Sequence, residues 1–154
     1  MNRKKNIFDK IGSFIPGYTG YALREGRRNC DKIMREEIAV KLSETEKTLY
    51  ERIAEALNSK DKRLATDIDE IRKEVNTICS RVNYAKYGAS AFFTESQIKE
   101  DELCHIYQID LDLTELIEKL KNNASSSTIS EIKNMLVMCQ EILSRRNSYI
   151  NEFK

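Results

Sequence analysis

The stretch LATDIDEIRKEVNTICSRVNYA, residues 64–85, decides the fold of this chain. Its apolar residues recur at alternating steps of four and three, the heptad spacing of a helix that packs against other helices. These positions are Leu64, Ile68, Ile71, Val75, Ile78, Val82 and Ala85. We therefore predict a long helix that Ser59 or Asp61 caps and that stops at Tyr87-Gly88, because glycine suits the left-handed end of a helix.

Three more long helices are predicted, over residues 21–57, 94–121 and 128–153. Thr94 with Gln97, and Thr128 with Glu131, form capping boxes that start two of these helices. A short amphipathic helix is predicted over residues 3–14. Short loops between consecutive helices make neighbours antiparallel. We expect an all-α fold, an elongated antiparallel bundle of four long helices preceded by the short N-terminal helix.

The composition agrees with long helices in a single domain. The 154 residues include one proline and five glycines, and 33% of them are charged. Few turn-forming residues mean few turns, and this length is typical of one domain. We expect one domain over residues 1–154, with an N-terminal amphipathic segment and Pro-Gly loop over 1–20 and the bundle over 21–154. No stretch approaches a membrane span or the apolar run of a signal peptide, so we expect a cytoplasmic protein.

No catalytic, cofactor or metal site is predicted. The four cysteines form no CxxC pair, so free buried thiols are their simplest interpretation. Cys104 and His105 are adjacent, but neighbouring helical residues point about 100° apart and do not converge as nucleophile and base. Glu102 and His105 form a single ExxH, whereas di-metal bundles use two such pairs. We therefore expect a protein without enzymatic activity.

Two charged residues interrupt the apolar seams of the last two helices. Asp110 and Arg146 occupy core-facing positions, where a charge is costly unless it is paired. Folding the third predicted helix onto the fourth about residue 91 places Arg72 level with Asp110. We therefore expect Arg72 to pair with Asp110 in a core polar network, with Arg146 the less favoured partner. A buried ion pair that sets the helix register is favoured over catalysis.

Positive charge gathers at the N-terminal end. Residues 1–35 hold nine Lys or Arg against three acidic residues, a balance of +6, and because the whole chain is +1 the remainder carries −5. Basic residues beside an apolar helical face are the pattern of a helix that lies on an anionic membrane surface. The residues concerned are Lys4, Lys5, Ile7, Phe8, Ile11 and Phe14. In the alternative interpretation this helix docks its apolar side on the bundle.

A second candidate surface surrounds the segment IPGYTGY, residues 15–21. Aromatic residues and arginines are favoured at protein interfaces. The interaction candidates here are Tyr18, Tyr21, Arg24, Arg27 and Arg28. Folding the second predicted helix onto the third about residue 59 brings this segment to the aromatic residues near 84–93. The two groups either form an interface or stack together and close that end of the bundle.

The stretches IPGYTGYALREGRRNCDKIMRE, YAKYGASAFF and ELCHIYQIDLDL resemble an uncharacterised prokaryotic all-helical family. That family combines a Pro-Gly-Tyr-x-Gly-Tyr motif, a charged run, a Tyr-Gly connection and an aspartate in the fourth helix. The matching positions are Pro16, Gly17, Tyr18, Gly20, Tyr21, Glu25, Arg28, Tyr87, Gly88 and Asp110. The resemblance spans most of the chain, implies an all-α fold and implies no particular chemistry. The layout is also similar to membrane-remodelling proteins of the phage-shock and ESCRT-III type, from which the Pro-Gly-Tyr loop departs.

Together these features predict a helical interaction or scaffold protein that binds a protein partner or a second copy of itself. The alternative is a peripheral membrane-surface protein anchored by its basic amphipathic N-terminus. Nucleic-acid binding ranks below both, because aromatic and basic residues are not interleaved along a recognition element.

Overall fold

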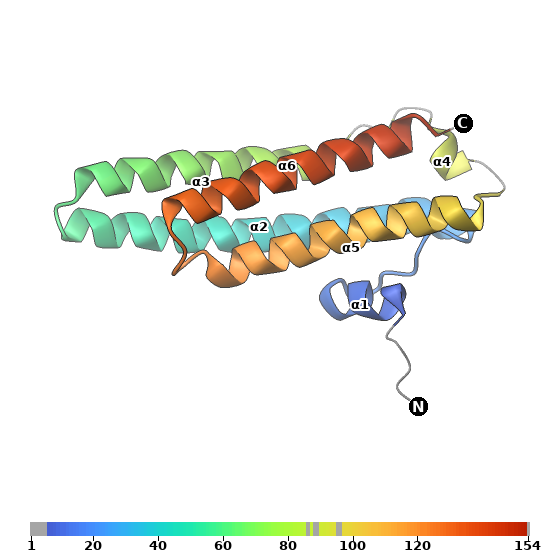
Figure 1. The fold of residues 1–154 in the computed structure, drawn as a ribbon, viewed down its shortest axis with the longest axis horizontal. Coiled ribbons are helices and arrows are strands. Elements are labelled where there is room, and N and C mark those ends of the chain that lie inside the picture. The colour runs from blue at the N-terminus through green and yellow to red at the C-terminus, as the bar shows by residue number, and fades with distance from the viewer. Residues whose placement is uncertain (1–5, 86, 88–89, 95–96, 154) are drawn as a thin grey trace.

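The computed structural model describes residues 6–85, 87, 90–94 and 97–153. Within these residues every regular element is a helix, so the predicted all-α bundle is confirmed. The long helices are α2 (Arg27–Asn58), α3 (Lys62–Asn83), α5 (Glu100–Asn123) and α6 (Ile129–Asn151). The short ones are α1 (Ile7–Phe14), the 3₁₀ helix η1 (Arg24–Gly26) and α4 (Ala91–Thr94). The long helices form an elongated bundle, and α1 lies against its side (Figure 1).

Two antiparallel hairpins build the bundle. α2 packs along α3 and α5 packs along α6, as expected for helices joined by short loops (Figure 1). Between the hairpins, α2 lies beside α5 and α3 beside α6, and these neighbours run parallel. α3 and α5 therefore lie diagonally opposite, and the predicted folding of the helix over residues 64–85 onto the helix over residues 94–121 is wrong. The short helix α4 lies between α3 and α5 in the chain.

Two of the predicted helix starts are confirmed. The Asp61 side chain accepts a hydrogen bond from the Leu64 backbone amide at 3.0 Å and caps α3. Thr128 and Glu131 form the predicted capping box of α6. Each of these caps satisfies amides that the first turn of a helix leaves without a partner.

Other predicted boundaries are wrong. α2 begins at Arg27 rather than Tyr21, because Tyr21 is drawn into the core before the helix starts. α3 ends at Asn83, ahead of the predicted stop, and Gly88 lies outside the described residues. Thr94 is the last residue of α4 and not the start of α5.

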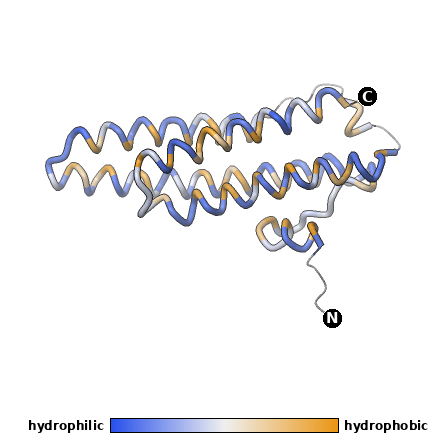
Figure 2. The backbone as a smooth tube through the Cα atoms, viewed as in Figure 1, coloured by the Kyte–Doolittle hydropathy of each residue, from blue (hydrophilic) through white to orange (hydrophobic). Residues whose placement is uncertain are grey.

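The predicted seam of α3 faces the core. Five of its residues, Ile68, Ile71, Val75, Ile78 and Val82, are at most 2% exposed. Hydrophobic residues recur along every long helix between hydrophilic ones (Figure 2). Burying each of these aliphatic side chains stabilises the fold by about 1.5–3 kcal/mol, which makes the helix–helix seams the main source of stability.

The α2–α3 hairpin is longer than the α5–α6 hairpin and projects beyond it at one end (Figure 1). Arg52 marks where four helices become two, because its Nη1 atom donates to the backbone carbonyls of Ala124 and Ser127, each at 2.9 Å. Beyond Arg52 the projecting hairpin carries Leu57, which is 54% exposed.

The N-terminal helix α1 packs on α5. Phe8 meets Tyr107 edge to face, with ring centroids 4.5 Å apart, and Ile11 is fully buried. Lys41 of α2 donates to the backbone carbonyl of Phe14 at 2.8 Å, so a cation holds the C-terminal end of α1. Residues 15–23 then lead from α1 into the core of the bundle.

Candidate functional site

A buried ion pair joins α5 to α6. Asp110 is 0% exposed, Arg146 is 2% exposed, and Arg146 Nε donates to Asp110 Oδ1 at 2.7 Å. The two seam interruptions found in the sequence therefore contact each other. A symmetric turn near residue 125 places Asp110 level with residue 140, six residues or about 9 Å short of Arg146. In the structure α5 ends at Asn123 and α6 begins at Ile129, so the turn is centred near residue 126 and Asp110 is level with about residue 142. The long side chain of Arg146 spans the remaining distance.

Arg72 is not the partner of Asp110, and this prediction is wrong. Arg72 Nε pairs with Asp69 at 2.7 Å, and its Nη1 pairs with Glu46 of α2 at 3.1 Å. Its guanidinium also lies over the ring of Tyr50. The reason is the order of the helices: α3 packs on α2 and α6, so Arg72 faces α2 rather than the diagonal helix α5.

A second buried carboxylate, Asp31 of α2, belongs to the same network. Its Oδ1 atom lies 2.8 Å from Arg146 Nη1 and accepts a hydrogen bond from the Tyr87 hydroxyl at 3.0 Å. Its Oδ2 atom accepts from Arg35 Nε at 2.9 Å. The sequence carried a signal for Asp31 that was missed, because stepping back three residues along the α2 seam from Met34 reaches it.

Two tyrosines from the Pro-Gly loop complete the environment of Asp110. The hydroxyls of Tyr18 and Tyr21 both donate to Asp110 Oδ2, at 2.8 and 2.6 Å. The Tyr21 hydroxyl also accepts a hydrogen bond from Arg146 Nη2 at 2.9 Å. The network thus joins the loop over residues 15–23, α2, Tyr87, α5 and α6, and Arg35 extends it to the C-terminal carbonyls of α3.

Arg146 has used its whole capacity for hydrogen bonds. A guanidinium carries five N–H donors. Here the acceptors are Asp110, Asp31, Tyr87, Tyr21 and the sulfur of Met34. Two carboxylates and the guanidiniums of Arg35 and Arg146 also balance in charge. Such a saturated, neutral network fixes the relative positions of helices and leaves Arg146 no donor for a ligand.

The buried tyrosines hold their protons tightly. Burial, assisted by the neighbouring Asp110, raises the pKa of Tyr18 and of Tyr21 well above the ordinary value. Burial also raises the pKa of Tyr87 to about 12. Burial opposes the charged form of Arg146, but Asp110 beside it keeps its pKa above the usual value. A general acid or base works best with a pKa near the working pH, and these four groups lie far above neutrality.

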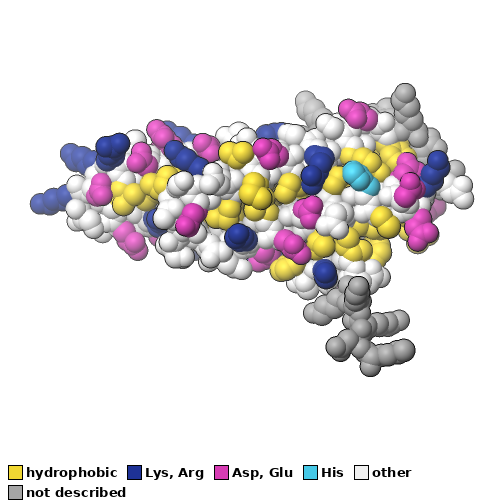
Figure 3. Space-filling view, viewed as in Figure 1, with side chains coloured by type: hydrophobic (Ala, Val, Ile, Leu, Met, Phe, Trp, Pro, Cys, Tyr) yellow, Lys and Arg dark blue, Asp and Glu magenta, His cyan; other side chains and the backbone are white. Residues whose placement is uncertain are grey.

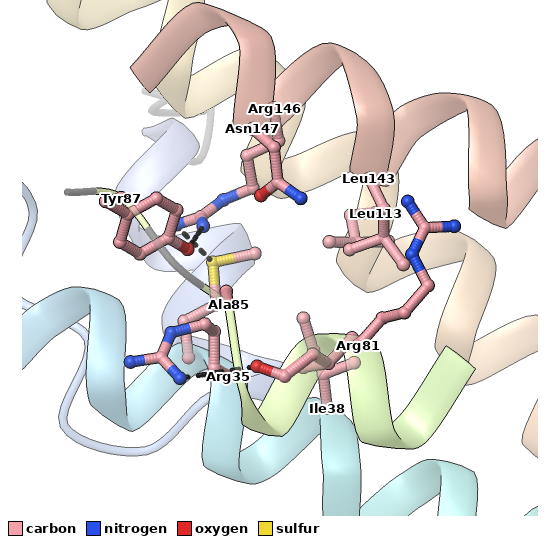
Figure 4. Close-up of a pocket in the computed structure, with 11 residues that line it drawn as sticks. Arg35, Ile38, Arg81, Ala85, Tyr87, Leu113, Leu143, Arg146 and Asn147 are labelled. Atoms are coloured by element: carbon pink, nitrogen blue, oxygen red, sulfur yellow. Dashed lines mark hydrogen bonds between the residues drawn. The ribbon is translucent and has the colours of Figure 1, made fainter. Parts of the chain in front are cut away.

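A small cavity lies beside this network, among α2, α3, α5 and α6 (Figure 4). It is lined by Met34, Arg35, Ile38, Arg81, Val82, Ala85, Tyr87, Leu113, Leu143, Arg146 and Asn147. The volume open to the centre of a water molecule is about 10 Å³, room for about one water. Pockets for small organic ligands are typically about 300–1,000 Å³, so this cavity is too small for a substrate of that size.

The predicted aromatic and arginine surface is largely interior. Tyr18 and Tyr21 are buried, and so is Arg27, whose Nε donates to the Tyr21 carbonyl at 2.8 Å. Only Arg24 and Arg28 of the interaction candidates are exposed. Of the five interaction candidates, three are therefore buried in the fold and two remain on the surface.

The aromatic residues of the loop instead close one end of the bundle. The ring centroids of Tyr21 and Phe92 are 5.1 Å apart, and the Arg28 guanidinium lies 4.7 Å from the Phe93 ring centroid. The predicted meeting of this segment with residues near 84–93 is confirmed.

The apolar membrane-surface candidates of α1 face the bundle in the structure. Ile7, Phe8 and Phe14 are partly buried and Ile11 is fully buried, because this face of α1 packs on the bundle. Lys4 and Lys5 lie outside the described residues. A membrane-anchoring role therefore requires α1 to leave α5.

The α5–α6 hairpin presents an open groove on its outer side. The groove consists of a hollow of about 600 Å³ and a neighbouring one of about 350 Å³, which share Lys119 and Met138. Its apolar residues are Leu116, Met135, Met138 and Ile142, and Met138 is 51% exposed. Hydrophobic side chains lie along this face between charged ones (Figure 3). We call this surface the α5–α6 groove.

Among the described residues, no three His, Cys, Asp or Glu side chains gather as a metal site would require. None of the described helices is both long and apolar enough to cross a lipid bilayer. No family model, no curated protein and no solved structure matches this chain. The geometry of the network and the groove is therefore what bears on function.

Proposed function

We propose that this chain is a non-enzymatic interaction protein that binds a partner protein in the α5–α6 groove. The observation that carries the proposal is the partly exposed apolar floor of this groove, with Met138 at its centre. Methionine adapts its shape to different apolar surfaces and is favoured where proteins bind partner helices. The buried network supports the same view, because it holds the helices that carry the groove while Arg146 has no donor left for a ligand.

Site-specific photo-crosslinking in cells of the source organism tests the proposal. A photoreactive residue replaces Met138 in one protein and Val40 of α2 in a control. The two positions are matched, since their side chains are 51% and 50% exposed on different hairpins. We expect a crosslinked protein at position 138 that is absent at position 40.

The crosslinked protein must then bind the purified chain directly. We expect Met138→Glu to weaken this binding at least about tenfold and Val40→Glu to leave it unchanged, because a buried carboxylate on an apolar contact is strongly unfavourable. Binding that is insensitive to Met138→Glu contradicts the proposal. So does any catalytic turnover that Asp110→Asn abolishes while the fold stays intact.

A further inference from the structure

We infer that the partner in the α5–α6 groove is a basic amphipathic helix, an inference that rests on the function proposed above. The groove combines a helix-sized length, an apolar floor and an excess of negative charge along its rims. Each of these properties follows from the contacts and exposure of its residues.

The dimensions of the groove suit a helix. Its lining runs along α5 from Asp112 to Asn123, which is about 17 Å or three helical turns. A helix that lies in such a groove inserts apolar residues at i, i+3 or i+4, and i+7. Leu116, Met138 and Ile142 provide the apolar contact for these residues.

The rims of the groove carry more acid than base. The lining holds four carboxylates and two cations, a balance of −2: Asp112, Glu115, Glu131 and Glu141 against Lys119 and Arg145. At one end Arg145 Nη2 lies 3.5 Å from Asp112 Oδ2, so these two charges compensate each other across the groove. One turn further, α5 presents Glu115 and the antiparallel α6 presents Glu141. Both are exposed and have no ion-pair partner in the part of the chain that the structure describes. A Lys or Arg placed over the groove at this level meets a carboxylate on each side.

The same charges disfavour two other occupants. In a dimer with both grooves face to face, two linings that each carry a net charge of −2 oppose each other, and opposing like charges are unfavourable. An anionic lipid surface is repelled by Glu115 and Glu141 in the same way. A basic helix is attracted by the same carboxylates that repel a second copy of the groove or an anionic lipid surface.

Three synthetic peptides of about fourteen residues test this inference. All three carry leucines at helix-face spacing, and the remaining positions are Lys, Gln or Glu. Binding is measured by fluorescence anisotropy, and amide NMR shifts locate the binding site. We expect the Lys peptide to perturb the amides of α5 and α6 and to bind about tenfold more tightly than the Glu peptide, with the preference shrinking at high salt.

Charge reversal in the groove provides the specific variant. Glu115→Lys combined with Glu141→Lys should reverse the preference, so that the Glu peptide binds more tightly than the Lys peptide. Glu51→Lys combined with Glu55→Lys changes the net charge equally at exposed positions of α2 and should leave the preference unchanged. Circular dichroism checks that both double variants remain folded.

The possible outcomes separate this inference from the proposed function. Equal affinity for the three peptides at the groove, or a preference that both double variants change alike, overturns the basic-helix inference and leaves the groove as a binding surface. A Lys peptide that perturbs no amide of α5 or α6 also overturns it. The proposed function itself is decided by the crosslinking at position 138.

Discussion

Arg146 contacts two buried carboxylates, Asp110 and Asp31, so its removal should be far more costly than the loss of a surface charge. Arg146→Met leaves Asp110 without its ion-pair partner and Asp31 with Arg35 alone. Removing one member of a buried ion pair typically destabilises a protein by about 3–5 kcal/mol. We expect a decrease of that size in the free energy of unfolding, measured by urea denaturation with far-UV circular dichroism.

The neighbouring arginine provides the control. Arg145 is exposed, and its contact with Asp112 is a surface ion pair. Arg145→Met should therefore change stability by at most about 1 kcal/mol. Similar losses in the two variants would show that the network does not stabilise the bundle as described.

Gly20 lies where no side chain can be accommodated. A Cβ atom there would come within 2.4 Å of Phe8 Cε1 and 2.8 Å of the Tyr107 hydroxyl oxygen, and its φ is +83°. Gly17 shares the positive φ, at +87°, but a Cβ there would meet nothing closer than 3.7 Å. We expect Gly17→Ala to cost about 1–2 kcal/mol from backbone strain, and Gly20→Ala to cost about 1–3 kcal/mol more from overlap.

Thermal unfolding of both glycine variants measures this difference. Gly12→Ala serves as a control, since Gly12 lies in α1 with open space around a Cβ, and alanine is the better helix former. Its melting temperature should stay the same or rise. If Gly17→Ala and Gly20→Ala lower the melting temperature equally, α1 and Tyr107 do not pack as closely as the structure indicates.

Alkaline pH should destabilise the fold through its buried tyrosines. The pKa of Tyr87 is raised from 10.0 to about 12, and that of Tyr21 is also raised well above its ordinary value. Above pH 10 the unfolded chain loses phenolic protons that the folded chain keeps, so stability that is fully present below pH 10 falls as the pH rises towards 12. We expect part of the phenolate absorbance to appear only together with the loss of helical circular dichroism. Complete tyrosine ionisation in a still helical protein would contradict this.

At the scale of single elements, α1 packs on the bundle in this structure. Substitutions on its buried and exposed faces test whether this packing, rather than membrane binding, is the role of the helix. Ile11→Asp places a charge at a fully buried position and should lower the stability by several kcal/mol, about 3 or more. Ser13→Asp on the exposed side of the same helix should change it by about 0.5 kcal/mol or less. Urea denaturation compares the two variants.

Vesicle flotation with the same proteins tests directly whether α1 binds a membrane surface. If α1 stays packed on α5, the wild-type protein should float with neither neutral nor anionic vesicles. Flotation with anionic vesicles alone, lost in Ile11→Asp, would favour the membrane-surface alternative, as would equal stability of Ile11→Asp and Ser13→Asp.

Helices were the part of the fold that the sequence predicted best. The α3 seam, the Asp61 cap and the Thr128–Glu131 capping box depend on residues a few positions apart, so local patterns are sufficient. The arrangement of the helices was not predicted, because a heptad seam indicates that a helix packs but not against which neighbour. The diagonal placement of α3 and α5 was not predicted, and the predicted cap at Thr94 was wrong because Thr94 belongs to α4.

The candidate site was also predicted in part: its charged core residues were identified, but most of their contacts were not. Asp110 and Arg146 stood out because each interrupts an apolar seam, and both belong to the buried network. Assigning Arg72 as the partner failed because it assumed that α3 and α5 form a hairpin. Tyr18 and Tyr21 were singled out as interaction candidates that could also close the end of the bundle. Their hydrogen bonds to Asp110 were not predicted, since nothing in a loop sequence shows that its hydroxyls reach a charge on a distant helix.

At the scale of the whole molecule, stability should differ between the two ends. Between Ile71 and Ile78, α3 lies within the four-helix part, whereas the projecting hairpin beyond Arg52 has only two helices. Regions with few buried apolar contacts open locally at lower free energy. We expect backbone amides of α2 beyond Arg52 to exchange with deuterium at least about tenfold faster than those of α3 between Ile71 and Ile78.

Native-state hydrogen exchange followed by NMR measures this contrast. Leu57→Lys in the projecting hairpin replaces a side chain that is 54% exposed and should leave the slow amides of the four-helix part unchanged. Uniform exchange rates along α2 and α3 would indicate that a further contact covers the projecting end.

The saturated network also restricts how this sequence can diverge. Replacing Asp110 or Arg146 alone strands a charge in the interior, whereas replacing a whole buried ionic cluster with apolar residues of similar volume can be neutral or stabilising. Tyr18 and Tyr21 donate to the same carboxylate, so their hydroxyls would lose their acceptor in the same event. Stepwise mutation between the polar and apolar versions of this core therefore passes through poorly folded intermediates. Homologous chains should keep these four positions together or exchange them together, as one epistatic block.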